Sequence, residues 1–352
     1  MAEMSDIIAR LLPLQLTFGR DDGSRPYCTT VELAAGGRVV GYQNPHEVLW
    51  RIDDGRLALS RADGMITTRF DEIVEDSPAR IILRGYARVS GAQKIYHILT
   101  GYSSSTILQA LRAELYSGVD PFAIAQTKYV DRGYPHSNLS AVPEMVESVL
   151  QIAAPSFWLE IGSMLGGSAI VTAAAVKRLG LRCGIVAIDP FCGDVNMWAW
   201  EHNLHLKGEW RFLRLEDGES TIYRRFLANV MAAGHHDIIL PITTTSIVGI
   251  KLLLRLHREQ RIDQVPSVIY LDSAHEPDET FLELRNAWDL LPSGGVLLGD
   301  DWSWNAVRTD VSRFAATVTQ NPTTATALRA TLPGTTGAGN VMLYKGQWLL
   351  LK

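Results

Sequence analysis

The spacing of apolar residues differs between the two halves of the chain. Between residues 27 and 83, short runs of alternating apolar and polar residues are separated by Gly-Gly and Asp-Gly pairs; these runs are 27–33, 47–52, 56–59 and 80–83. Alternation with a period of two, bounded by such turns, indicates antiparallel strands. The pattern predicts a small antiparallel β domain, a sandwich or half-barrel. A short amphipathic helix is expected before it at 5–17, and a helical pattern follows it from Ile95 to about Ser117.

From residue 157 onward, apolar strands alternate with amphipathic helices. Runs such as 183–188 and 268–271 are apolar throughout, as expected of strands covered by helices on both faces. The alternation predicts an α/β domain with a doubly wound parallel sheet. The tail is different, because 326–329 and 341–350 predict a closing antiparallel pair with no helix between. The expected strands are 157–161, 183–188, 236–242, 266–272 and 294–299, and the expected helices are 167–179, 218–233, 246–259, 277–291 and 304–317.

Length and turn positions suggest how the chain is divided. A chain of 352 residues is long enough for two domains of ordinary size. The turn-rich stretch 116–121 sets the boundary. This gives a mainly-β auxiliary domain with its closing helix at 1–117, a connector or lid at 118–150, and the α/β domain at 151–352. The polar and aromatic segment 128–138 leaves both readings open, a lid over the ligand site or an interdomain connector.

Composition narrows the class of protein. Hydrophobic residues make up 47% of the chain and charged residues 20%, as in a soluble globular protein. The net charge of -5 argues against a nucleic-acid partner, and three cysteines without a CxxC pair favour a reducing compartment. Acidic residues near the start and the lack of an apolar stretch of about 20 residues predict a cytoplasmic protein without membrane attachment.

The stretch 157–168 carries the first candidate site. An apolar strand ends at Glu160 and Ile161, and a turn with Gly162, Ser163 and Gly166 leads into a helix that begins near Ser168. Glycines let the backbone approach a ligand, and the first turn of a helix offers unpaired N–H groups. Close packing of helix on strand is the alternative explanation of the Gly166-Gly167 pair.

An acid at the end of the next strand completes this site. A carboxylate at Asp189 can hold both hydroxyls of a ribose, so the pair of features predicts a nucleoside-type cofactor. The spacing of Gly162 and Gly166 departs from the G-x-G-x-x-G of dinucleotide sites, and Glu160 would repel a pyrophosphate. A cationic ligand is therefore favoured.

A second set of acids follows two later strands. Asp272, Asp300 and Asp301 come after neighbouring parallel strands, so their carboxylates are expected at the same edge of the sheet as the glycine loop. An all-oxygen set of this kind suits Mg²⁺ or a similar hard divalent cation. The alternative is that Asp300 and Asp301 only cap the following helix. His275 is expected to take a proton from a substrate hydroxyl, or else to play a structural part. Trp302 and Trp304 are expected to wall the acceptor pocket.

The residues of these two sets resemble a known family. Leu159-Glu160-Ile161-Gly162-Ser163 with Gly166-Gly167-Ser168, followed by Ala187-Ile188-Asp189-Pro190-Phe191, is similar to motif I and the following acid of class I S-adenosylmethionine-dependent methyltransferases. Asp189-Pro190-Phe191-Cys192-Gly193-Asp194 with Trp198 resembles the bacterial subgroup of sugar O-methyltransferases in macrolide and aminocoumarin biosynthesis. The resemblance covers roughly residues 140–350. It implies a Rossmann-like fold with an antiparallel C-terminal strand pair.

The resemblance also implies roles for individual residues. It assigns S-adenosylmethionine to Glu160, Gly162, Ser163, Gly166, Ser168 and Asp189, and a divalent cation to Asp272, Asp300 and Asp301. In catechol-type relatives a lysine occupies the position of His275, so the role as base is kept with a different residue type.

The predicted function is O-methylation of a small hydroxylated molecule, a sugar or glycosylated natural product, that depends on S-adenosylmethionine and on Mg²⁺ or a similar cation. A homo-oligomer is expected. Two alternatives stay open, an NAD-dependent oxidoreductase and a non-catalytic S-adenosylmethionine-binding protein.

Overall fold

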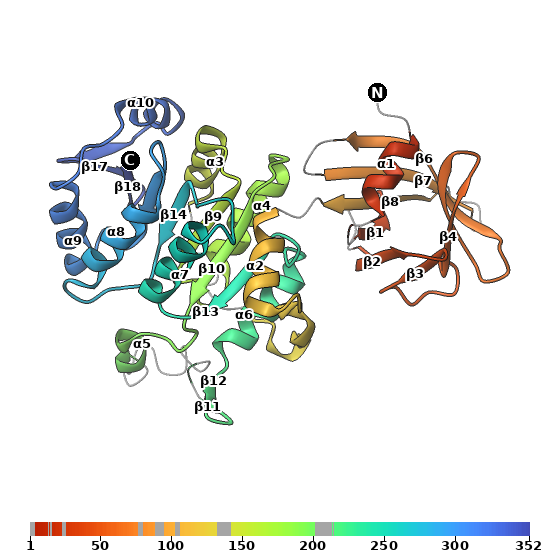
Figure 1. Ribbon diagram of the computed structural model, residues 1–352, viewed down its shortest axis with the longest axis horizontal. Helices are drawn as coiled ribbons and strands as arrows, with labels where there is room; N and C mark the ends of the chain where they lie inside the picture. Colours follow the sequence, from red (N-terminus) through yellow and green to blue (C-terminus); the bar gives the residue numbers. More distant parts are fainter. Residues whose placement is uncertain are drawn as a thin grey trace. The chain divides into compact units, whose positions relative to one another are not determined.

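The computed structural model divides into two compact units, Met1–Ser104 and Ser105–Lys352 (Figure 1). It describes residues 4–12, 14, 16–22, 26–76, 80–88, 95–102, 106–131, 142–200, 213 and 215–352. The predicted lid segment 128–138 lies mostly outside these residues, because 132–138 are not described. Among the described residues, no helix is both long and apolar enough to cross a membrane.

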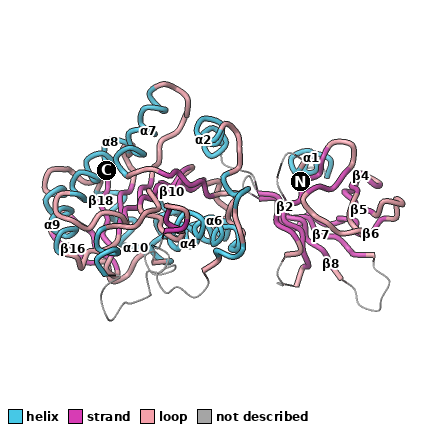
Figure 2. Tube along the Cα trace, turned by 90° about the horizontal axis from the view of Figure 1, so that it is seen from below, coloured by secondary structure: helices cyan, strands magenta, loops and turns pink. Residues whose placement is uncertain are grey.

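The first unit is a closed antiparallel barrel of eight strands with one helix, α1. Neighbours in sequence pair with one another, and β1 pairs with both β2 and β8, which closes the sheet. Figure 2 shows these strands in magenta with α1 beside them. The elements are α1 (Met4–Leu11), β1 (Leu16–Arg20), β2 (Cys28–Ala34), β3 (Arg38–Val40), β4 (Leu49–Asp53), β5 (Arg56–Ser60), β6 (Ile66–Asp76), β7 (Arg80–Ala87) and β8 (Tyr96–Tyr102).

Apolar side chains fill the barrel, so its interior is a packed core. Leu16, Phe18, Leu57 and Phe70 are fully buried there together with residues of α1. The alternation in the sequence therefore places one face of each strand inward, as the predicted β domain requires. The sheet closes fully, which goes beyond the sandwich or half-barrel that the turns suggested.

The expected helix from Ile95 to about Ser117 is wrong in its first half. Residues Tyr96–Tyr102 form β8, and the helix α2 occupies only Thr106–Tyr116. The inward positions of β8 include His97, Leu99 and Gly101, all buried. Because one of these is polar and another has no side chain, the period of two is hidden in the sequence.

The boundary between the two units lies after Ser104, earlier than the expected residue 117. Helix α2 belongs to the second unit, where Ile107, Leu108 and Leu111 pack in its core. The Tyr116 hydroxyl donates a hydrogen bond to the carbonyl of Pro241 at 2.5 Å. The helix therefore does not close the barrel domain; it covers the sheet of the second unit.

The second unit is built on an eight-stranded sheet with the order β13-β10-β9-β14-β15-β18-β17-β16. Its strands β13, β10, β9, β14 and β15 are parallel, β18 is antiparallel to β15, and β17 is antiparallel to β18. The C-terminal antiparallel pair is thus present, but both of its strands come from the predicted run 341–350. The strands are β9 (Phe157–Ile161), β10 (Gly184–Asp189), β13 (Ile239–Thr243), β14 (Val268–Leu271), β15 (Val296–Gly299), β16 (Thr336–Ala338), β17 (Val341–Tyr344) and β18 (Gln347–Leu351).

Helices cover both faces of this sheet (Figure 1). Residues of α3, α4, α6 and α10 share one core with side chains such as Trp158 and Ile185, whereas α2, α7, α8 and α9 share another with Leu159 and Val186. Successive strand residues thus face opposite cores, which explains the uninterrupted apolar runs. The helices are α3 (Pro143–Ala153), α4 (Gly167–Arg178), α5 (Val195–Trp200), α6 (Ile222–Ala233), α7 (Ser246–Arg258), α8 (Glu279–Leu290), α9 (Asn305–Ala315) and α10 (Pro322–Thr331).

Helix α10 corrects the expected strand at 326–329. Asn321 accepts hydrogen bonds from the N–H groups of Thr323 and Thr324, and Pro322 occupies the first helical position. An asparagine cap followed by proline is a strong helix start. The short hairpin β11 (Leu215–Glu216) and β12 (Glu219–Ser220) and the 3-10 turns Pro121–Ile124 and Thr127–Tyr129 complete the described elements.

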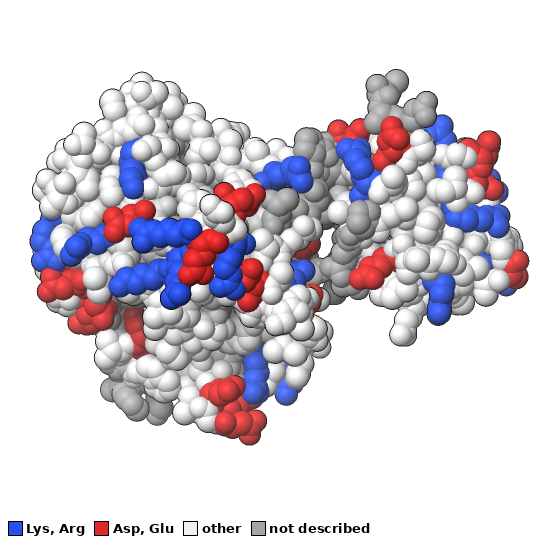
Figure 3. Space-filling view, in the orientation of Figure 1, with Lys and Arg blue, Asp and Glu red and all other residues white. Residues whose placement is uncertain are grey.

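Strand order decides where a ligand can bind. The chain passes from β9 to β10 on one side, whereas β14 and β15 lie on the other side of β9. Neighbouring loops therefore leave the sheet in opposite directions at the carboxyl ends of β9 and β14, which is where open α/β sheets bind ligands. On the face that Figure 3 shows, the Lys and Arg side chains of the described residues are interspersed with Asp and Glu.

Candidate functional site

A cavity of about 660 Å³ opens at the carboxyl ends of the parallel strands. It is lined by the loop after β9, the end of β10, the start of α7, the loops after β14 and β15, and one side of α8. Backbone bonds align these strand ends, since Gly162 donates to Ile188, Asp272 donates to Ile161, and Asp300 donates to Leu271. Members of both residue sets expected from the sequence therefore line one cavity, although Glu160 and Gly166 of the first set do not.

The glycine loop between β9 and α4 is tightly built. Gly162 has a φ of 88°, and a Cβ added to it would lie 1.9 Å from the carbonyl oxygen of Asp272. Only glycine fits where the backbone takes a left-handed conformation against another chain segment. Gly162, Ser163 and Ser168 line the cavity. Gly166, also at a φ of 88°, is close to α6, since a Cβ added to it would lie 3.1 Å from the Phe226 ring, and it is not among the residues that line the cavity.

Glu160 lies behind this loop and not in the cavity. It is completely buried, and the Ser168 hydroxyl donates a hydrogen bond to its Oε1 at 2.9 Å. Burial raises the pKa of Glu160 to about 7, although the Ser168 hydrogen bond opposes the rise. The sequence predicted that this carboxylate faces a cationic ligand. The structure places it where it ties the start of α4 to β9.

Asp189 lies at the end of β10 and lines the cavity. Its Oδ2 accepts a hydrogen bond from the Met164 N–H at 2.8 Å, and its Oδ1 accepts one from the Phe191 N–H at 2.5 Å. Burial raises the pKa of Asp189 to about 6, and these N–H groups oppose part of the rise. The carboxylate is thus fixed in place beside the glycine loop, as predicted, with its remaining lone pairs available to ligand hydroxyls.

The second residue set forms a compact cluster. One ligand atom each from Asp272, His275 and Asp301 lies within 4.8 Å of the others. Asp272 follows β14, and Asp301 follows β15, so adjacent parallel strands bring them together. Carboxylate and imidazole donors at this separation fit a divalent cation.

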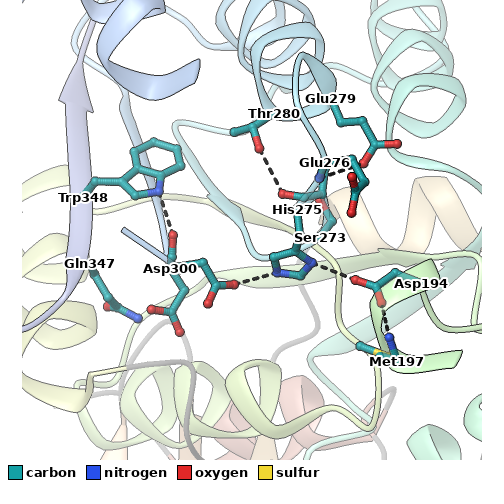
Figure 4. Close-up of polar contacts among 12 residues, drawn as sticks. Asp194, Met197, Ser273, His275, Glu276, Glu279, Thr280, Asp300, Gln347 and Trp348 are labelled. Atoms are coloured by element: carbon teal, nitrogen blue, oxygen red, sulfur yellow. Dashed lines mark hydrogen bonds and ion pairs between the residues drawn. The ribbon is translucent and has the colours of Figure 1, made fainter. Parts of the chain in front are cut away.

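His275 lies between two carboxylates (Figure 4). Its Nδ1 lies 2.7 Å from Oδ2 of Asp194, and its Nε2 lies 2.7 Å from Oδ2 of Asp301. The ring also packs against Trp304, with the ring centroids 4.8 Å apart. Burial lowers the pKa of His275, but the hydrogen bonds to the two carboxylates outweigh it and raise the pKa.

Asp300 lines the same cavity but is not part of this compact cluster. Its carbonyl accepts a hydrogen bond from the Trp348 indole at 2.8 Å, and burial raises the pKa of its carboxyl group to about 6. The expected set of three acids is therefore brought to one cavity. In this structure, however, His275 takes the place of Asp300 beside Asp272 and Asp301. Trp304 lines the cavity as expected, whereas Trp302 does not, and both pack against the core that contains α9.

Two residues of the cavity were not singled out in the sequence. Asp194 lies in the quoted Asp-Pro-Phe-Cys-Gly-Asp stretch, but only its contact with His275 gives it a role in the site. Glu283 of α8 is buried and accepts a hydrogen bond from the Ser273 hydroxyl at 2.9 Å. Burial raises the pKa of Glu283 to about 7. Because a glutamate within a predicted helix is usually exposed to solvent, the sequence did not indicate that Glu283 lines the cavity.

Comparison with known proteins bears on this site. Residues 159–302, from within β9 to the loop after β15, match the family model described as a methyltransferase domain. This span includes every residue of the two predicted sets. The match supports the predicted enzyme class, an S-adenosylmethionine-dependent methyltransferase. No curated protein matches the sequence.

Solved structures give weaker likenesses. An O-methyltransferase from Bacillus cereus in complex with SAH is 14% identical over 71% of this chain and 92% of its own, with a TM-score of 0.33. CalS11, a calicheamicin methyltransferase, is 15% identical over 59% of this chain and 75% of its own, with a TM-score of 0.38. TomG from Streptomyces achromogenes, an O-methyltransferase of tomaymycin synthesis, is 14% identical over 71% of this chain and 91% of its own, with a TM-score of 0.33.

Proposed function

We propose that the second unit transfers the methyl group of S-adenosylmethionine to a hydroxyl group of a small molecule. The observation that carries this proposal is the shared cavity, into which the glycine loop, Asp189 and the cluster of Asp272, His275 and Asp301 all open. Methyl transfer is an in-line displacement, so a donor and an acceptor must be held next to each other. One cavity with a cofactor end and an acid cluster meets this requirement.

The donor end is formed by the glycine loop and Asp189. The backbone of Gly162 and Ser163 faces the cavity, and the Asp189 carboxylate is held by two backbone N–H groups. We assign the ribose hydroxyls of the cofactor to Asp189, since a fixed carboxylate can accept both of them. Ser168, at the first turn of α4 and tied to Glu160, is assigned to the polar end of the cofactor.

The acceptor end is formed by the acid cluster. Asp272 and Asp301 would hold a divalent cation such as Mg²⁺, with Asp300 beside them at the same edge of the sheet. A bound cation lowers the pKa of a hydroxyl group that it contacts. We assign removal of the hydroxyl proton to His275. Because the Asp301 carboxylate bonds its Nε2 and helps to raise its pKa, this role requires that a cation held by Asp301 free Nε2. Water is restricted there, because the side chain of His275 is only 12% exposed.

The acceptor class that we propose is a sugar or a glycosylated natural product. Hydroxyl and carboxylate groups of Thr245, Ser246, Glu279 and Glu283 line the cavity, and Trp304 and Leu282 add apolar surface. Polar groups that can bond several hydroxyls beside an aromatic face suit a sugar ring. A flat aromatic acceptor would use fewer of these groups.

Titration calorimetry and a transfer assay test the function. We expect purified protein to bind S-adenosylmethionine and S-adenosylhomocysteine, and not NADH. With labelled donor, we expect transfer to a sugar nucleotide or a glycosylated macrolide, and loss of transfer in EDTA that added Mg²⁺ restores. Absence of S-adenosylmethionine binding would refute the function, and turnover unaffected by EDTA would remove only the metal.

A further inference from the structure

Helix α6 carries a polar side chain, Asn229, on the face that it buries. Ile222, Phe226 and Asn229 follow one another at i, i+4 and i+7, so an apolar residue is expected at the third position. Asn229 is nevertheless only 8% exposed. Burying an amide is unfavourable unless its donor and its acceptor both find partners. We propose that Asn229 is a positioning residue that fixes the glycine loop, residues 162–166. This inference rests on the proposed function, in which that loop holds S-adenosylmethionine.

Both ends of the Asn229 amide have backbone partners. Its Nδ2 donates a hydrogen bond to the Leu165 carbonyl at 3.0 Å, and its Oδ1 accepts one from the Asp131 N–H at 2.8 Å. With the amide turned over, its NH₂ would face the N–H of Asp131 and its oxygen would face the carbonyl of Leu165, so both contacts would become repulsive. The two partners therefore hold the side chain in one orientation, with its donor on the glycine loop.

The glycine loop needs support from outside because its backbone conformation is uncommon. Gly162, Met164 and Gly166 all have positive φ values, of 88°, 42° and 88°. For Met164, which has a Cβ, a left-handed conformation is unfavourable. Such a conformation persists where the surrounding structure holds it in place. The Asn229 amide binds the next residue, Leu165, which itself lines the cavity.

Met164 connects this support to the cofactor end of the cavity. Its N–H donates at 2.8 Å to Oδ2 of Asp189, the carboxylate that we assign to the ribose hydroxyls. A loop that leaves its conformation gives up this bond, and the carboxylate then loses one of the two N–H groups that orient it. Without the Asn229 bond, a smaller fraction of molecules would have a loop ready for the cofactor, and the apparent affinity would fall by the same factor.

Asp131, in the segment that precedes α3, holds the other end of the amide. Its carboxylate is 4% exposed and accepts a hydrogen bond at 2.8 Å from Arg225, one turn before Asn229 on α6. Two residues of α6 thus bind Asp131, Arg225 through the carboxylate and Asn229 through the backbone N–H. None of the described residues 118–131 lines the cavity. This segment therefore supports the glycine loop at a distance, through Asn229.

The variant Asn229→Leu tests this role. Leucine keeps the branched shape of the side chain but can neither donate to the Leu165 carbonyl nor accept from the Asp131 N–H. We expect the Kd for S-adenosylmethionine, measured by calorimetry, to rise about tenfold, as for the loss of a buried hydrogen bond. In the transfer assay, we expect KM for S-adenosylmethionine to rise by a similar factor, while kcat and KM for the acceptor change less than about threefold.

Hydrogen exchange makes the test independent of the cofactor. In the free protein, the peptide that covers residues 162–166 should exchange about tenfold faster in Asn229→Leu than in the parent. The matched control is Lys177→Met, which removes a part-buried ion pair with Asp237, 2.7 Å long, near the other end of α4. This control should lower Tm but change neither the Kd nor the exchange of that peptide. If Asn229→Leu does not fold, Asn229→Ala removes the same two bonds with a smaller side chain and takes its place.

The outcomes separate this inference from the proposed function. Unchanged affinity in Asn229→Leu would overturn the inference and leave methyl transfer standing. Weaker binding that Lys177→Met shows to the same extent, or weaker binding without faster exchange of the loop, would also overturn it. If the parent protein does not bind S-adenosylmethionine, the proposed function fails, and the exchange of residues 162–166 still decides whether Asn229 holds the loop.

Discussion

Gly162→Ala is the substitution that probes how the cofactor loop and the acid cluster depend on each other. Gly162 has a φ of 88°, and a Cβ there would lie 1.9 Å from the Asp272 carbonyl oxygen and 2.9 Å from the Cα of Ser273. No rotamer change relieves such a contact, because all of these atoms belong to the backbone. The loop after β9 and the loop after β14 must separate.

The magnitude follows from two contributions. A left-handed conformation costs an alanine roughly 1–2 kcal/mol. Separating the loops also strains the hydrogen bond that Asp272 donates to Ile161 at 2.9 Å, and a typical backbone hydrogen bond contributes about 1 kcal/mol net. With the repacking of the strand ends, we expect a loss of about 3 kcal/mol or more. Gly334→Ala is the matched control, since Gly334 has a φ of 90° and no atom within 4 Å of its added Cβ.

Urea unfolding followed by tryptophan fluorescence measures both variants. Trp50 is the only tryptophan of residues 1–104, so the signal reports mainly the second unit. We expect Gly334→Ala to lose only the conformational contribution of about 1–2 kcal/mol. Calorimetry should show weaker S-adenosylmethionine binding for Gly162→Ala alone. Equal losses of stability in the two variants would refute the idea that the loop is packed against Asp272.

Three further outcomes are expected. Ser168→Ala removes the hydrogen bond to buried Glu160 and should lower the free energy of unfolding by about 1–3 kcal/mol, measured by urea unfolding against an exposed Ser303→Ala control. Asp189→Asn should weaken S-adenosylmethionine binding about tenfold in calorimetry, and unchanged affinity would remove the ribose assignment. It should also lower Tm, because the amide NH₂ would face one of the two backbone N–H groups that the carboxylate accepts. Burial lowers the pKa of His97 to about 4, so its neutral form is favoured in the barrel. Above pH 6.5 the neutral His97 leaves the free energy of unfolding at its full value. As pH falls from 6.5 toward 4, this free energy should decrease by about 2 kcal/mol, and the decrease should be absent in His97→Gln.

The sequence predicted the second unit well because its signals are long and redundant. Each parallel strand is buried on both faces, so a run such as 184–188 is apolar up to the acid that ends the strand. The barrel was harder to predict. Its strands are short, and β8 carries His97 and Gly101 at inward positions. The His97 imidazole is satisfied by the Thr68 hydroxyl at 2.8 Å, a partner 29 residues away that no local pattern shows.

The site was predictable in its residue types and less so in its contacts. Strand ends locate Asp189, Asp272 and Asp301 at one edge, because a parallel sheet places all carboxyl ends together. Whether a side chain faces the cavity or the core depends on backbone dihedrals that the sequence does not show. Glu160 is an example, because its side chain is fully buried behind the glycine loop and does not reach the cavity. The contact between Asp194 and His275 joins loops 81 residues apart.

The pair Asp300 and Asp301 shows how those dihedrals build the site. Successive side chains of an extended chain point to opposite sides, so two consecutive acids would not normally face one cavity. Asp301 has a φ of 60°, a left-handed conformation that is uncommon for a residue other than glycine, and both acids line the cavity. Two hydrogen bonds hold this turn: the indole N–H of Trp348 in β18 donates to the Asp300 carbonyl, and the backbone N–H of Trp304 donates to the Asp301 carbonyl. The antiparallel C-terminal strand thus supports the acid pair. Trp348, outside the cavity, and Trp304, in its wall, therefore stabilise the strained backbone that brings Asp301 to His275.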